Sequence, residues 1–207
     1  MSRTVRPATP DELAAWRRVI SEWLGPAEFA AMVEDLRDAH GDHAIDQAGS
    51  VFRDAWVAAK CAETWEAEGV RLGADPPDFE LRWGRRGVSF EVVEVQAPGR
   101  RRGDELKADR RKTPAERAAP VDVPQEAWTP AADVLAQLRR TAAAKAAVSY
   151  AAGSALIVYL NVWPVAGSAE LKRGQAEALA PAVAKFKAVW ILDDGRLEPI
   201  GDASLQD

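Results

Sequence analysis

The chain has 207 residues, of which 47% are hydrophobic and 29% charged, so it is long enough for one ordinary domain with a buried core and wholesale disorder is excluded. Its single cysteine, Cys61, excludes an intrachain disulfide and a cysteine-built zinc site, and is typical of a protein in a reducing cytoplasm. The net charge of -5 excludes a globally basic surface, so contacts with nucleic acid would have to come from a local basic segment.

Neither a secretory signal nor a membrane span is expected. Residues 1–11 contain arginines but no apolar segment. The longest apolar run, residues 155–165, is interrupted by Asn161 and falls short of the roughly 20 residues that cross a bilayer. We therefore expect a cytoplasmic protein without membrane contact, and the abundance of alanine and arginine suggests a bacterial source.

The first 50 residues are predicted to form a helical extension. Residues 9–12, TPDE, are typical of a helix start, because a proline suits the first turn and carboxylates suit the positive end of the helix. Apolar residues then recur at helical spacing until Gly25-Pro26 ends the segment. A second helix is expected over residues 27–39.

A third helix is predicted over residues 51–68. Phe52, Trp56, Ala59 and Glu63 follow one another at steps of four, three and four, so they share one face of this helix. Glu63 is therefore expected to be a carboxylate beside an apolar stripe.

Beyond this helix, alternating residues predict strands. A short strand is expected at residues 70–72, the alternation around Phe79 and Leu81 predicts another, and residues 84–87, GRRG, predict a hairpin turn into a valine-rich strand over residues 88–96. The remaining elements are predicted in this order: a basic, proline-containing insertion loop (99–129), a helix (131–152), an apolar strand (155–162), a helix (170–186), and two strands joined by a tight turn (188–192 and 196–200). The predicted domains are an N-terminal helical extension, residues 1–50, and an α/β domain, residues 51–207.

Three polar side chains stand at neighbouring strand ends. Asp78 precedes one strand, while Glu94 and Gln96 close the next and point to the same face because they are two residues apart. A carboxylate on a valine-rich strand is unfavourable to bury unless it is paired or binds a metal. Phosphodiester hydrolysis needs a divalent ion that polarises the phosphate and activates a water, and Mg²⁺ prefers carboxylate oxygens. Glu91 points to the opposite face and is a poorer candidate.

With Pro77-Asp78 opening one strand and Glu94-Val95-Gln96 ending the next, the chain resembles the PD-(D/E)XK nuclease superfamily over residues 51–163. The resemblance implies an α/β (α+β) fold with a restriction endonuclease-like core, an α-β-β-β-α-β mixed sheet flanked by helices. It implies that Asp78 and Glu94 hold Mg²⁺ or Mn²⁺, with the Val95 carbonyl available as a third ligand. The third motif position is normally lysine; here it is Gln96, which can position a water but carries no charge.

Two further residues receive roles from the resemblance. Lys145, on the following helix, would supply the cation that Gln96 lacks, and Glu63 would be an auxiliary metal ligand. Each has a structural alternative: Lys145 as a lysine at the margin of an apolar stripe, and Glu63 in an ion pair with Lys60 or Arg71. The same holds for the strand motif, since Asp78 could end a turn and Glu94 with Gln96 could face solvent.

Nucleic-acid contacts are expected from two basic segments, the hairpin and the insertion loop, and the alternative for the loop is a solvated, flexible segment. Arginine contacts to phosphate would depend on salt and be largely independent of base sequence. The predicted contact residues are Arg85, Arg86, Arg100, Arg101, Arg102, Lys107, Arg110, Arg111 and Lys112.

Together these features predict an enzyme, a metal-dependent nuclease that acts on DNA rather than RNA. The alternative is a catalytically inactive module of the same fold that binds nucleic acid or a protein partner, because fold does not fix function and the motif lysine is missing. A coincidental acid pair in another kind of α/β protein is a third reading. A homodimer and a targeting protein partner are both compatible with the nuclease reading.

Overall fold

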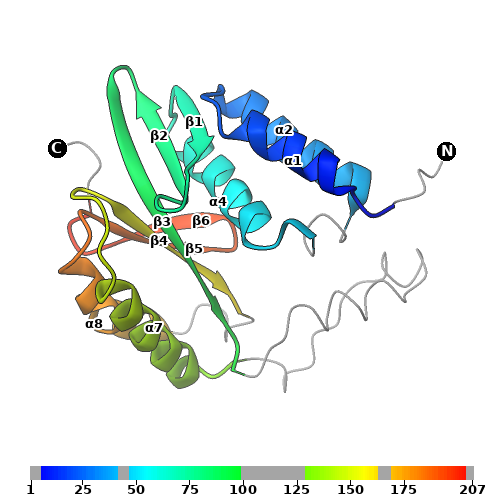
Figure 1. Ribbon diagram of the computed structural model, residues 1–207. Coiled ribbons are helices and arrows are strands. Elements are labelled where there is room, and N and C mark those ends of the chain that lie inside the picture. Colours follow the sequence, from blue (N-terminus) through cyan, green and yellow to red (C-terminus); the bar gives the residue numbers. More distant parts are fainter. Residues whose placement is uncertain (1–5, 42–46, 99–128, 163–168, 204–207) are drawn as a thin grey trace. The chain divides into compact units, whose positions relative to one another are not determined.

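The computed structural model describes residues 6–41, 47–98, 129–162 and 169–203. Within these ranges the chain forms five helices and six strands, and the strands lie in the order β1-β2-β3-β4-β5-β6 in one mixed sheet (Figure 1). The expected mixed α/β fold is therefore confirmed at this level, whereas a restriction endonuclease-like core stays a prediction.

The chain divides into two compact units. The first contains the residues up to 92 together with residues 153–155, and the second contains residues 93–152 and those from 156 onward. The N-terminal helices pack within the same unit as the helix that follows them.

Three helices belong to the first unit: α1 (Pro10–Ile20), α2 (Pro26–His40) and α4 (Ser50–Thr64). The α1 helix begins with a capping box, in which the Thr9 side chain accepts from the Glu12 N–H and the Glu12 carboxylate accepts from the Thr9 N–H. Pro26 begins α2, where its missing N–H costs nothing. The two helices lie side by side in Figure 1.

The strands of the first unit form an antiparallel meander of β1 (Gly69–Leu72), β2 (Phe79–Trp83) and the first part of β3 (Arg86–Gln96). Phe79 pairs with Phe90, and the two rings stack 4.7 Å apart between centroids. Trp65 stacks on Phe90 at 5.5 Å, and its carbonyl accepts a hydrogen bond from the Trp83 indole. These contacts explain why α4 ends at Thr64, earlier than the predicted residue 68: Trp65 leaves the helix to pack on the sheet.

The second unit contains the end of β3, α7 (Ala131–Ala146), β4 (Ala155–Asn161), α8 (Ala169–Val183), β5 (Val189–Asp193) and β6 (Arg196–Ile200). β4 and β5 are parallel, as the intervening helix requires, whereas β5 and β6 form an antiparallel hairpin. The predicted helix over 131–152 is shorter in the structure, where α7 ends at Ala146 and Ala147 is its C-cap.

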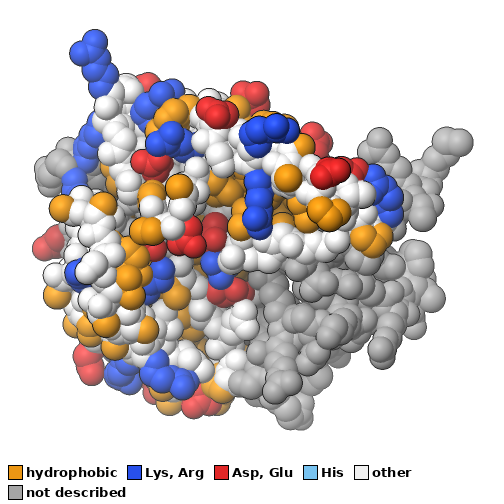
Figure 2. Space-filling model, in the orientation of Figure 1, with side chains coloured by type: hydrophobic (Ala, Val, Ile, Leu, Met, Phe, Trp, Pro, Cys, Tyr) orange, Lys and Arg blue, Asp and Glu red, His pale blue; other side chains and the backbone are white. Residues whose placement is uncertain are grey.

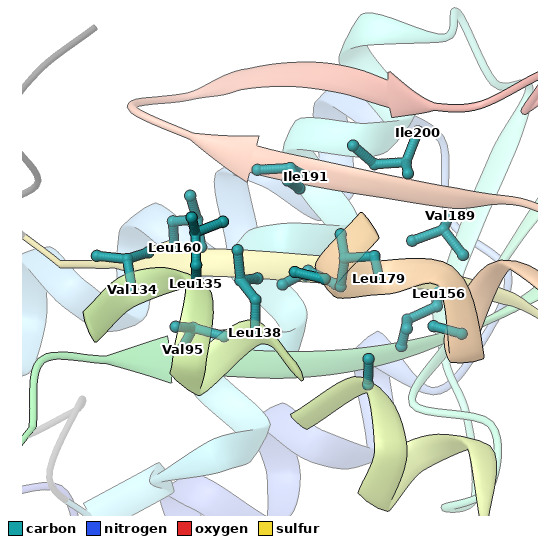
Figure 3. Close-up of a cluster of buried hydrophobic side chains, with 14 of the residues drawn as sticks. Val95, Val134, Leu135, Leu138, Leu156, Leu160, Leu179, Val189, Ile191 and Ile200 are labelled. Atoms are coloured by element: carbon teal, nitrogen blue, oxygen red, sulfur yellow. The ribbon is translucent and has the colours of Figure 1, made fainter. Parts of the chain in front are cut away.

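The core of the second unit lies between α7, α8 and one face of the strands (Figure 3). Leu138 of α7 and Leu179 of α8 are fully buried there with Leu156 of β4 and Ile191 of β5. Val95 of β3 contributes to the same cluster. Because strand side chains alternate, this contact turns Glu94 and Gln96 to the opposite face of β3.

Candidate active site

The turn that leads into β2 holds Asp78 through its backbone. Gly73 N–H donates to the Asp78 carbonyl at 2.9 Å, and Asp75 N–H donates to the Pro77 carbonyl at 3.2 Å. Asp78 N–H in turn donates to the Phe90 carbonyl on β3 at 3.0 Å. The backbone of Asp78 is therefore fixed both within its own turn and against the neighbouring strand.

The Asp78 side chain is also anchored to β3. Its Oδ2 accepts a hydrogen bond from the Val92 N–H at 2.6 Å, and a carboxylate acceptor makes such a bond stronger than one between neutral groups. Asp78 is half-buried. The bond gives Asp78 a structural role in closing the turn, which is one of the two readings of its sequence position, and it fixes the direction of the carboxylate.

Glu94 lies in the second unit and is bonded to a residue that sequence reasoning did not select. Its Oε1 accepts a hydrogen bond from the side-chain amide of Asn161, the last residue of β4. Glu94, Gln96 and Asn161 are all half-buried. The pair therefore joins the ends of two strands that are neighbours in the sheet.

Two signals in the sequence could have directed attention to Asn161. It is the only asparagine of the chain, and it ends the most apolar strand, ALIVYLN. Its pairing with Glu94, however, joins residues 67 positions apart. Only the alignment of β3 with β4 brings them together.

Asp78 belongs to the first unit and Glu94 to the second, while β3 runs through both. Along this strand, Val92 binds the Asp78 carboxylate and precedes Glu94 by two positions. Alternation gives residues 92, 94 and 96 of one strand the same face.

Lys145 lies away from this strand end. Its ammonium group lies 5.3 Å from the ring centroid of Tyr150, and that ring packs on Phe186 at 5.2 Å. Tyr150 and Phe186 precede the starts of the parallel strands β4 and β5, whereas Glu94 is bonded to the last residue of β4. The two ends of a seven-residue strand are about 20 Å apart. The contact with Tyr150 fits the structural reading of Lys145, and its charge-compensating role stays a prediction.

Glu63 points outward from the end of α4. Its side chain is 75% exposed and forms an ion pair with Lys60 at 3.4 Å. Phe52 and Ala59 on the expected apolar stripe are buried. This is the ion pair that the alternative reading named, and Glu63 as an auxiliary metal ligand stays a prediction without a supporting contact.

Two buried carboxylates of the first unit were not selected from the sequence. Asp54 of α4 is 7% exposed and pairs with Arg53 at 2.7 Å, and Glu91 of β3 is 3% exposed. Alternation along β3 predicts that Glu91 points to the face opposite Glu94, and in the structure this side chain is buried.

Of the predicted nucleic-acid contacts, the structure describes two, at the β2–β3 hairpin. Arg85 is exposed and Arg86 half-buried, whereas Arg100, Arg101, Arg102, Lys107, Arg110, Arg111 and Lys112 lie outside the described residues. Arg71 and Arg82 lie over the Trp23 ring, 4.6 and 4.7 Å from its centroid. On the face drawn in Figure 2, basic and acidic side chains are interspersed.

Each unit holds oxygen donors of the kind that a hard divalent cation prefers. The first unit has the Asp78 carboxylate, and the second has the Glu94 carboxylate and the amide oxygens of Gln96 and Asn161. Among the described residues no group of three or more His, Cys, Asp or Glu is placed to hold a metal ion. A metal site at either set of donors would therefore have few carboxylates and would rely on water and substrate oxygens, as Mg²⁺ sites usually do.

Comparisons with protein-family models, with curated proteins and with solved structures found no match for this chain. In the part of the chain that the structure describes, no helix has the length and apolar character needed to cross a membrane.

Proposed function

We propose that the protein is a Mg²⁺- or Mn²⁺-dependent nuclease that hydrolyses phosphodiester bonds, in DNA rather than RNA, in the cytoplasm of a bacterium. One observation carries the proposal. The Asp78 carboxylate is anchored to the Val92 N–H, two residues before Glu94 in the same strand. The bond supports the proposal because it fixes the direction of the carboxylate that would be the first metal ligand.

The roles follow from the chemistry of each side chain. Asp78 and Glu94 would hold the ion, with the Val95 carbonyl as an available third oxygen, and a bound ion would polarise the phosphate and lower the pKa of a water. Gln96 lies on the Glu94 face of β3 and would orient that water through its amide. We leave Lys145 and Glu63 out of the proposed machinery, because one packs on Tyr150 and the other pairs with Lys60.

Nucleic acid would be held by the basic residues of the hairpin and of residues 100–112. The hairpin offers Arg85 as an exposed cation. Since the chain is acidic overall, binding would depend on these local charges and weaken steeply with salt. The same proposal fits a homodimer whose two sites act on the two strands of a DNA duplex. It also fits a targeting partner.

A second candidate function is a binding module of the same fold without catalysis. Gln96 occupies the motif position that is normally lysine, and its uncharged amide cannot stabilise developing charge as a lysine would. Glu94 is already bonded to Asn161. A Glu94 carboxylate that accepts a hydrogen bond from an amide can hold two strand ends together without binding a metal ion. The two functions differ in whether Glu94 binds a metal ion.

The test is cleavage of linear, circular and single-stranded DNA and of RNA, each with Mn²⁺ or with EDTA. Wild type is compared with Glu94→Ala and with Glu198→Ala as a matched control, because Glu198 is a half-exposed glutamate of the same unit that pairs with Lys172. We expect Mn²⁺-dependent cleavage in wild type and Glu198→Ala and its loss in Glu94→Ala. DNA binding without cleavage, together with no Mn²⁺ binding by the folded wild-type protein, would select the binding module.

A further inference from the structure

The bond between Asn161 and Glu94 fixes a candidate metal-binding carboxylate of the second unit to a neighbouring strand. The Asn161 Nδ2 donates to Glu94 Oε1, and both side chains are half-buried at strand ends. The backbone of Asn161 is well held, because β4 pairs with β5 along Leu156–Tyr159 and buries Leu160. Asn161 therefore offers Glu94 a donor on a rigid element.

A glutamate needs such a donor more than an aspartate does. Its longer side chain has more rotatable bonds, and ordering them on metal binding costs free energy. A donor on one carboxylate oxygen fixes the side-chain direction beforehand, and outer partners of this kind hold the ligands of many metal sites. Asp78 has an equivalent partner in the Val92 N–H.

We infer that Asn161 is the positioning residue of Glu94: it holds the carboxylate on the face of β3 that Gln96 shares, with one oxygen bonded and oriented for a divalent cation. The inference rests on the proposed function, since orientation matters only if Glu94 is a ligand. It assigns to β4 a part of the site that the acid motif of β2 and β3 does not contain.

A single asparagine makes the contact directly observable. Protein labelled with [¹⁵N]asparagine gives one pair of side-chain amide signals, which must belong to Asn161. We expect these signals to shift in Glu94→Ala and not in Glu198→Ala. We also expect substoichiometric Mn²⁺, which is paramagnetic, to broaden them in wild type and not in Glu94→Ala.

Mn²⁺ affinity measures the positioning itself. Asn161→Leu keeps the side-chain size and removes the donor, while Asn161→Ala, which also removes the donor, is a second variant in case the first does not fold. We expect either to weaken Mn²⁺ binding about 10–100-fold with unchanged circular dichroism. Gln175→Met, which alters another buried amide of the same unit, is expected to leave Mn²⁺ affinity unchanged. In a Glu94→Gln background, Asn161→Leu should have no further effect, because it acts only through Glu94.

These measurements distinguish failure of the positioning role of Asn161 from failure of the proposed nuclease function. Tight Mn²⁺ binding by wild type and equally tight binding by the folded Asn161 variants would overturn the positioning role and leave the proposed function standing. Unchanged chemical shifts of the Asn161 side-chain amide in Glu94→Ala would overturn the contact. A folded wild-type protein that binds no Mn²⁺ would overturn the proposed function, and the Asn161–Glu94 bond would then be structural only.

Discussion

Gly73 lies so close to the Pro77 carbonyl that no side chain fits between them: a Cβ at Gly73 would be 1.8 Å from that oxygen. The same turn carries the bond from Gly73 N–H to the Asp78 carbonyl. We predict that Gly73→Ala forces the turn open and displaces Asp78. The free energy of unfolding should fall by about 1–3 kcal/mol. Urea unfolding and Mn²⁺ affinity, measured on the same variant, check both effects.

Gly25→Ala is the control for this substitution. A Cβ at Gly25 meets no atom within 4 Å, and its φ of -65° suits alanine. Its only expected effect is that of a poorer helix N-cap, about 1 kcal/mol or less. Equal stability of the two variants would show that the turn yields without strain.

The free energy of unfolding should depend on the Glu12 side chain at neutral pH and lose this dependence at strongly acidic pH. The Arg6 side chain, and then the backbone and hydroxyl of Thr9, hold the pKa of Glu12 at about 2, below its ordinary 4.5. A pKa that is lower in the folded state means that the carboxylate stabilises the protein above pH 4.5 and that this contribution is lost as pH falls towards 2. Glu12→Ala should therefore lower the urea midpoint at pH 7 and approach wild type near pH 2. A difference that does not change with pH would rule out the ionised capping box as its source.

The ionised Asp193 carboxylate should destabilise the folded protein, which is the opposite of the effect of Glu12. Burial at the end of β5, with Asp194 and Glu198 nearby, raises the pKa of the Asp193 carboxyl, although Lys172 opposes the shift. Ionisation of Asp193 then disfavours folding, so its unfavourable contribution grows as pH rises past the ordinary pKa of an aspartate. Asp193→Asn is expected to raise the thermal midpoint at pH 7 and to have little effect at pH 3. Asp202→Asn, at an exposed position, is the control, and a gain of the same size there would contradict the burial argument.

Leu138 tests the core of the second unit. It is fully buried on α7 within the cluster that also receives Val95 of β3 (Figure 3). Leu138→Ala should lower the free energy of unfolding by about 2–5 kcal/mol, because it removes buried methyl groups and leaves a cavity. Val148→Ala, where the side chain is 49% exposed, should change it by about 0.5 kcal/mol or less. Denaturant unfolding of both variants makes the comparison.

The elements of the fold could be predicted because their signals are local. The capping box at Thr9, the alternation around Phe79 and the apolar run of β4 each lie within a few residues, and each element formed where it was expected. Helix ends were less predictable: α4 ends early because Trp65 packs on Phe90, a contact made across the fold. The acids of the motif were selected from their spacing, but the partners of Asp78 and Glu94 were not.

The order of helices and strands, the alternation that turns Glu94 and Gln96 to one face, and the overall acidity of the chain all follow from the sequence. The contacts of each candidate side chain depend on the folded chain. There Asp78 accepts from Val92, Glu94 accepts from Asn161, Lys145 lies over Tyr150, and the exposed Glu63 pairs with Lys60. Propensity and periodicity act between near neighbours in the sequence, whereas strand register and helix packing select partners that are distant in it.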